Sequence, residues 1–163
     1  MSEHRCASAA KIGTLDEIRA RVEAARAAGR SVALANGVFD LLHVGHVRYL
    51  EAAKGMADVL VVAVNSDAST RANKGPGRPV IPEDERAELV AALACVDHVV
   101  IFEEKSPIGV IRALRPDVQV KGTDYTPDSI PERAEVESWG GRVAVAGDPK
   151  NHSTTDTLRR LER

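Results

Sequence analysis

The sequence of 163 residues contains 22 lysines and arginines against 24 aspartates and glutamates, and hydrophobic residues make up 44% of it. This balance is typical of one globular domain, and it excludes a disordered chain and a general binder of nucleic-acid backbones, which carries a basic excess. Because no apolar run approaches the roughly 20 residues that cross a bilayer, and only 3% of the residues are aromatic, we expect no membrane partner and no nucleic-acid partner.

The N-terminal segment, residues 1–13, lacks the apolar core of a secretory signal. We predict that it is a flexible tail. Residues 14–163 are expected to form a single domain. Two cysteines, Cys6 and Cys95, are far apart and match neither a disulfide framework nor a metal-binding spacing. This cysteine usage is typical of a reducing compartment, and we therefore expect a cytoplasmic protein.

The rest of the sequence alternates helical patterns with short apolar runs. Thr14 and Glu17 have the spacing of a capping box, apolar residues follow at helical intervals, and Gly29 stands where this first helix would end. The apolar runs that predict strands cover residues 32–35, 59–64, 98–102, 118–120 and 143–146. Helices are predicted over residues 44–54, 82–93, 107–114 and 131–139, and a last one after a cap at Ser153. This order predicts an α/β, Rossmann-like three-layer fold, with a five-stranded parallel sheet and helices on both faces.

One long segment, residues 66–79, fits neither pattern. It is polar and rich in glycine, proline and cationic residues, so it is predicted to be a single long loop. Its three cations, Arg71, Lys74 and Arg78, could bind a phosphate or remain solvated on the surface. We favour Lys74 as the functional one.

Polar residues follow the predicted strands, where open parallel sheets bind their ligands. The turn after the first strand contains His43 and His46, which are three residues apart at the start of a predicted helix and can face one bound group. The N–H groups and the dipole of that helix end favour an anion such as phosphate, and Gly37 and Gly45 would let the backbone approach it. A metal site lacks a third ligand of suitable spacing, and plain surface histidines are the other alternative. We therefore interpret the turn as a phosphate-binding site.

The segment Asn36-Gly-Val-Phe-Asp40, followed by His43-Val-Gly-His46, resembles the first signature of the cytidylyltransferase-like nucleotidyltransferases. From Ser31 onwards the chain is more closely similar to the adenylyltransferase half of bacterial ADP-heptose synthesis enzymes, through segments such as NGVFDLLHVGHVRYL, VAVNSDAS, VKGTDY and STTDTL. The resemblance implies transfer of AMP from ATP to D-glycero-β-D-manno-heptose 1-phosphate. Pyrophosphate is released, and Mg²⁺ is the ion expected to accompany ATP.

The resemblance also implies site residues. His43, His46 and Lys74 are the predicted catalytic residues. The predicted nucleotide-binding residues are Asn36, Gly37, Phe39, His43, His46, Arg86, Lys121, Gly122, Asp124, Ser153, Thr154 and Thr155. The sugar phosphate is expected to bind Asn65, Asp67, Lys74 and Arg78. Asp40 is expected to orient the turn or to stand beside a metal, and no metal ligand is assigned.

Several of these residues have a second interpretation. Arg86 could be an exposed helical arginine that pairs with acidic neighbours, and Ser153 could only cap the last helix. The chain could also be a cytidylyltransferase that acts on glycerol 3-phosphate or another small phosphate. A third alternative is a nucleotide-binding module without turnover.

The resemblance further implies a homodimer. In fused relatives a sugar kinase precedes the nucleotidyltransferase, and 163 residues are too few for both. We therefore expect a separate enzyme to supply the heptose 1-phosphate.

Overall fold

The computed structural model describes residues 7–149 and 153–161. Its strands are β1 (Val32–Gly37), β2 (Val59–Asn65), β3 (His98–Phe102), β4 (Val118–Lys121) and β5 (Arg142–Val145). Its α-helices are α1 (Leu15–Ala27), α2 (Val44–Lys54), α3 (Asp67–Lys74), α4 (Glu83–Ala91), α5 (Ile108–Leu114), α6 (Arg133–Glu137) and α7 (Thr154–Leu161), and its short 3-10 helices are η1 (Ala9–Lys11) and η2 (Pro127–Ser129). No helix within the described ranges is long and apolar enough to cross a membrane.

All the strand pairs are parallel, and the order across the sheet is β3-β2-β1-β4-β5. The chain adds β2 and β3 on one side of β1 and then returns to place β4 and β5 on the other side. This topology confirms the predicted Rossmann-like fold. The reversal between β1 and β4 creates a crevice at the carboxyl ends of these strands, where ligands bind in folds of this class.

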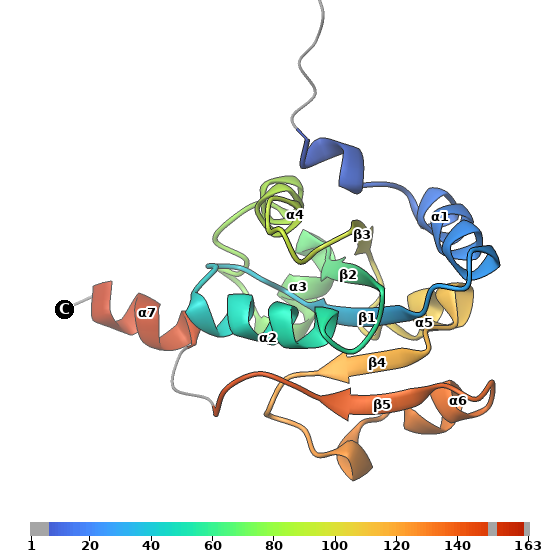
Figure 1. Ribbon diagram of the computed structural model, residues 1–163. Coiled ribbons are helices and arrows are strands. Elements are labelled where there is room, and N and C mark those ends of the chain that lie inside the picture. The colour runs from blue at the N-terminus through green and yellow to red at the C-terminus, as the bar shows by residue number, and fades with distance from the viewer. Residues whose placement is uncertain (1–6, 150–152, 162–163) are drawn as a thin grey trace, which may run out of the picture.

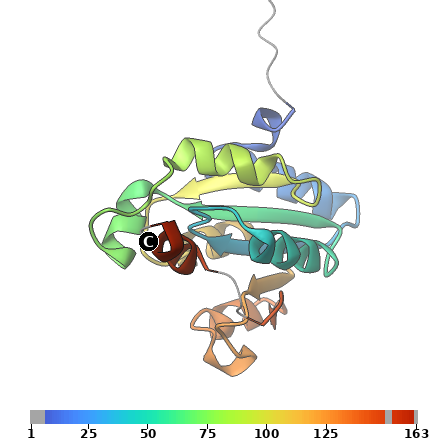
Figure 2. The same ribbon diagram turned by 90° about the vertical axis from the view of Figure 1, so that its left-hand side faces the viewer.

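Helices cover both faces of the sheet (Figure 1). On one face, α2 and α4 pack against the strands through buried side chains such as Leu50 and Val90. On the other face, α1, α5 and α6 pack through Ile18, Ile111 and Val136. Because the inner strands are buried on both faces, they read as continuous apolar runs in the sequence. In Figure 2, α7, in dark red, stands in front of the sheet.

The segment 66–79 differs from the single long loop predicted for it, because its first half is the helix α3. Ser66 caps this helix, with its hydroxyl accepting a hydrogen bond from the N–H of Ser69 at 3.0 Å. Gly75 ends it with a φ of 89°, a conformation that glycine adopts without strain. Asp67 in the first turn and Lys74 in the last complement the helix dipole. The glycines and prolines that follow hid these end signals in the sequence.

The N-terminal segment is also more ordered than the predicted tail. After η1, Ile12 forms a parallel bridge with Val99 of β3, and the N–H of Gly13 donates to the carbonyl of Val99 at 3.1 Å. Lys11 Nζ donates to the carbonyl of Leu93 at 3.2 Å. This segment therefore covers the edge of β3. Residues 1–6, which include Cys6, lie outside the described part of the chain.

Candidate active site

A pocket of about 420 Å³ opens at the carboxyl ends of β1, β2, β4 and β5. It is lined by the loops that follow these strands and by the beginnings of α2 and α7. All the predicted site residues except Asp67 and Arg86 line it: Asn36, Gly37, Phe39, His43, His46, Asn65, Lys74, Arg78, Lys121, Gly122, Asp124, Ser153, Thr154 and Thr155. Residues not predicted as ligand contacts also line it, among them Tyr49, Thr123, Tyr125, Gly147 and Asp148.

His43 and His46 form one wall of the pocket at the beginning of α2. Their rings stack with centroids 3.9 Å apart. The backbone N–H of His43 donates to Nδ1 of His46 at 3.3 Å, so a neutral His46 ring carries its proton on Nε2. Burial and the charge of His43 lower the pKa of His46 to about 4. At neutral pH His46 is therefore a neutral donor whose Nε2–H can bind a phosphate oxygen.

Phe39 supports the histidine pair from below the pocket surface. Its backbone has a φ of 50°, which is unusual for a residue other than glycine. Its side chain is only 3% exposed, and its ring centroid lies 5.3 Å from that of His46. A Cβ on Gly37 would come within 3.1 Å of the Phe39 ring, so this glycine makes room for the ring. The ring thus packs beside His46 and offers no broad face for a nucleotide base.

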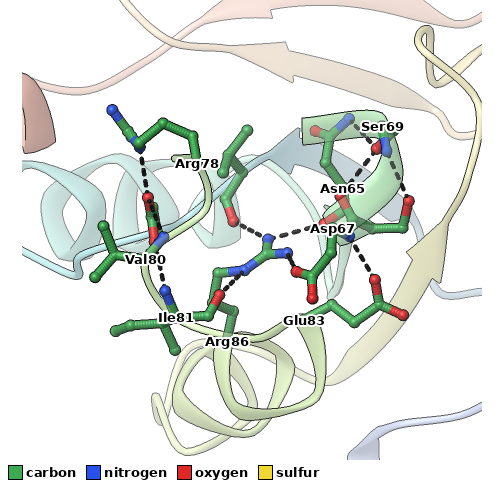
Figure 3. A network of polar contacts seen from close by, with 11 residues as sticks. Asn65, Asp67, Ser69, Arg78, Val80, Ile81, Glu83 and Arg86 are labelled. Carbon is green, nitrogen blue, oxygen red and sulfur yellow. Dashed lines mark hydrogen bonds and ion pairs between the residues drawn. The ribbon is translucent and has the colours of Figure 1, made fainter. Parts of the chain in front are cut away.

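Asp40 ties the loop after α3 to the histidine turn. Its side chain, 1% exposed, accepts from Nε of Arg78 at 2.8 Å. It also accepts from the N–H groups of Val80 and Ile81, at 2.8 and 3.0 Å. Figure 3 shows this row of donors along the loop. Asp40 therefore orients the turn and fixes the pocket cation Arg78, and both of its oxygens are engaged with protein donors.

Arg86, a predicted nucleotide-binding residue, is not among the residues that line the pocket. Its side chain is fully buried and donates to the carbonyls of Ile81, Val38 and Asn65 at 2.8, 2.5 and 2.8 Å. It also donates to Oδ1 of Asp67 at 2.8 Å (Figure 3). The fold brings three carbonyls and a carboxylate to one point, and only a guanidinium has enough donors to bind them together.

Asp67, predicted to bind the sugar phosphate, does not line the pocket either. Its carboxylate pairs with Arg86. Because Val38 follows β1 and Asn65 ends β2, Arg86 joins the carboxyl ends of these two strands. Arg86 and Asp67 therefore support the pocket from behind.

The side of the pocket next to α3 carries two cations and an amide. Lys74, exposed at the end of α3, and Arg78 line it together with Asn65. The amide of Asn65 donates to Oγ of Ser69 at 3.2 Å, which anchors the side chain to α3. Two cations beside a polar amide are a suitable site for a phosphate group.

Lys121, at the end of β4, brings a buried positive charge to the pocket. Its Nζ lies 3.4 Å from each carboxylate oxygen of Glu132 and 5.4 Å from the centroid of the Tyr125 ring. Desolvation lowers the pKa of Lys121, and the charge of Glu132 opposes this effect. Sequence reasoning missed Glu132 because no motif contains it and only the turn through η2 brings it back to β4.

The beginning of α7 closes the pocket on the side of α2. Ser153 caps α7, because its Oγ accepts from the N–H of Asp156 at 3.0 Å. Thr154 Oγ1 donates to the carbonyl of Leu41 at 3.4 Å, which ties α7 to the turn before His43. The capping role considered for Ser153 is thus present, and it is compatible with a ligand contact because Ser153 also lines the pocket.

One protein-family model matches a region of the chain that includes the residues lining the pocket. A family model described as Cytidylyltransferase-like matches residues 34–160. The chain belongs to the cytidylyltransferase-like family. All the residues that line the pocket fall within the matched region, so the family assignment applies to the site as well as to the sheet.

Similar proteins agree with this family assignment. The Bifunctional protein HldE of Syntrophotalea carbinolica is 47% identical over 161 residues, which are 99% of this chain and 33% of that protein. The Bifunctional protein HldE of Acidiphilium cryptum is 51% identical over 91% of this chain and 32% of its own length. The chain thus spans about a third of the length of these curated relatives.

A solved structure shares the fold. It is the crystal structure of the lipopolysaccharide core biosynthesis protein from Thermoplasma volcanium GSS1, with a TM-score of 0.62 and 31% sequence identity. The match covers 72% of this chain and 94% of that one. The cytidylyltransferase-like family and the parallel-sheet fold are therefore supported by sequence and by structure.

Proposed function

We propose that the chain transfers AMP from ATP to D-glycero-β-D-manno-heptose 1-phosphate, giving ADP-heptose and pyrophosphate. The observation that carries this proposal is the pair His43 and His46 at the beginning of α2, with cationic side chains on both sides of the pocket. A helix N-terminus with neutral and cationic donors around it is suited to a polyphosphate. The catalytic set of the proposal is His43, His46 and Lys74.

The reaction needs alignment and charge stabilisation more than a general base. A phosphate oxygen of the sugar attacks the α-phosphorus of ATP, and the bond to the bridging oxygen breaks so that pyrophosphate leaves with the electron pair. Because a sugar phosphate is already ionised near neutral pH, no side chain has to remove a proton from it. The pocket therefore has to hold the two phosphate groups in line.

The donors of the pocket supply this stabilisation. Nε2–H of His46 can bind an oxygen of the α-phosphate, and the helix dipole at the start of α2 favours an anion at the same wall of the pocket. Lys121, at the end of β4, and Thr123, after it, also line the pocket and are suited to the remaining nucleotide phosphates, as is Ser153 at the beginning of α7, on the side of α2. Lys74 and Arg78 then remain for the sugar phosphate.

Mg²⁺ enters this proposal with the nucleotide. The described residues contain no group of three or more His, Cys, Asp or Glu side chains that could hold a metal ion, and Asp40 is engaged with Arg78 and two backbone donors. Mg²⁺ commonly binds through substrate phosphates and keeps several waters. It would neutralise phosphate charge as part of the substrate.

The sugar assignment is supported by the resemblance to the adenylyltransferase half of ADP-heptose synthesis enzymes and by the naming of HldE relatives. The Thermoplasma protein, named for lipopolysaccharide core biosynthesis, is in accord with a heptose precursor. The family description favours CTP as the competing donor. Since ATP is the donor in our proposal, we expect the reaction in the cytoplasm.

We also expect the protein to be a homodimer. Light scattering of the purified protein would measure its oligomeric state.

A matrix of substrates tests the proposal. Pyrophosphate release is measured with ATP or CTP against heptose 1-phosphate, a hexose 1-phosphate and glycerol 3-phosphate. We expect turnover with ATP and heptose 1-phosphate. Exclusive use of CTP would support the glycerol 3-phosphate type of cytidylyltransferase, and ATP binding without turnover of any acceptor would support a non-catalytic module.

A further inference from the structure

Glu132 stands behind the pocket, outside every motif that the sequence offers. It directly precedes α6 and is only 6% exposed, and it is not among the pocket-lining residues. Its carboxylate faces the ammonium of Lys121, which does line the pocket and is 7% exposed at its side chain. Glu132 thus lies beside Lys121, a pocket cation whose side chain is shielded from water.

The geometry of the pair suits control of charge more than stability of the fold. Both distances from Lys121 Nζ to the carboxylate oxygens of Glu132 are 3.4 Å, longer than a short charge-assisted hydrogen bond. Glu132 Oε2 is buried and has no hydrogen-bond donor among the described residues. A buried ion pair with such incomplete satisfaction adds little net stability. The main effect of Glu132 is therefore to keep Lys121 positively charged at the pocket.

The surroundings of Lys121 make its charge depend strongly on Glu132. Two charged or titratable side chains lie against Lys121: Glu132, ahead of α6, and Tyr125, in the loop after β4. Its partner in the register of β5 is the apolar Val145. A buried ammonium without a counter-charge tends to lose its proton, and a neutral amine cannot neutralise a phosphate.

We propose that Glu132 is a positioning residue that holds the Lys121 ammonium at the pocket as a cation for the anionic substrate. The proposal rests on the proposed nucleotidyl transfer only for its kinetic readout. The carboxylate contacts no substrate itself. It acts through Lys121, and the loose 3.4 Å geometry leaves the ammonium able to turn a donor towards an incoming phosphate.

The primary test is the titration of Lys121 by NMR in the 163-residue protein, with Lys121→Arg used to assign the resonance. In Glu132→Gln the pKa of Lys121 is expected to fall by about one unit or more, the usual effect of a nearby opposite charge. Glu135→Gln is the matched control, because Glu135 lies three residues further along and pairs with Arg112 on the surface. An unchanged Lys121 pKa in Glu132→Gln would overturn the proposal, whether or not the protein turns over heptose 1-phosphate.

Kinetics provide the second readout. In Glu132→Gln the alkaline limb of the kcat/KM profile should move to lower pH. At a given assay pH, kcat/KM should fall roughly tenfold for each unit by which the pKa of Lys121 lies below that pH. Glu132→Asp should restore part of the wild-type profile. Absence of turnover in wild type would refute the proposed function and leave the titration to decide the role of Glu132. A loss of activity in Glu132→Gln with an unshifted pH profile would indicate a merely structural role and overturn the proposal.

Discussion

Replacing Arg86 by lysine separates a supporting role from a phosphate-binding role. Arg86→Lys keeps the positive charge, but one ammonium cannot reach all of the acceptors that the guanidinium binds at the ends of β1 and β2. Each buried hydrogen bond to a charged group is worth about 1.5–3 kcal/mol. If two of these bonds are lost, the free energy of unfolding should fall by about 3 kcal/mol or somewhat more, close to the cost of breaking a buried ion pair.

Urea unfolding, followed by the fluorescence of Trp139, measures this change, since the sequence contains a single tryptophan. A loss of about 3 kcal/mol corresponds to a fall in Tm of roughly 6–12 °C for a domain of this size. Arg112→Lys is the matched control: Arg112 also pairs with a carboxylate, Glu135, but its side chain is 61% exposed. Its substitution should leave the stability close to that of wild type, as is usual for an exposed ion pair.

The opposite pattern would refute the supporting role of Arg86. If Arg86→Lys unfolds at the same urea concentration as wild type while KM for ATP or for the sugar phosphate rises roughly tenfold or more, then Arg86 contacts a substrate. The original motif-based prediction would then be correct, and the buried network of Figure 3 would have to open during catalysis.

Two further predictions concern His46. His46→Gln should lower kcat about 10²-fold, the usual cost of losing a donor that stabilises transition-state charge, and pyrophosphate release with an unchanged kcat would contradict the assigned role. The stability of wild type should also fall as the pH drops from 6.5 towards 4, because the unfolded chain binds a proton at this position near pH 6.5 whereas the folded His46 does so only near pH 4. The loss is at most about 1.4 kcal/mol per pH unit, and partial exposure of the ring reduces it. Urea unfolding at both ends of this window, in wild type and in His46→Gln, measures the difference, and equal losses in the two proteins would count against the lowered pKa.

Much of the fold could be predicted because the strands carry their own signal. Strands such as β2, whose residues are all buried, read as unbroken apolar runs, and prolines mark the starts of α4, α5 and α6. The prediction failed at α3, where short-range capping by Ser66 is followed by glycines and prolines typical of a loop. It also failed at residues 9–13, whose attachment to Val99 depends on a contact distant in sequence.

The site was predictable where one motif carries several functional groups, as at His43 and His46. The ion pair between Arg86 and Asp67 could not be predicted from their sequence contexts, because it depends on the packing of α4 against the end of β2. Glu132 was missed for the same reason, since its partner lies 11 residues away across η2. A buried charge can be assigned to ligand or to support only after its acceptors are known.

The most direct test of nucleotidyl transfer at this pocket follows the phosphorus atoms of ATP. The protein is incubated with heptose 1-phosphate and with ATP labelled at either the α- or the γ-phosphorus, and the products are separated and counted, with His43→Ala and His46→Ala as comparisons. We predict that the α-label appears in ADP-heptose and the γ-label in pyrophosphate, and that both histidine variants are strongly slowed. Transfer of the γ-label to the sugar, or label transfer that is unaffected in both histidine variants, would contradict the account.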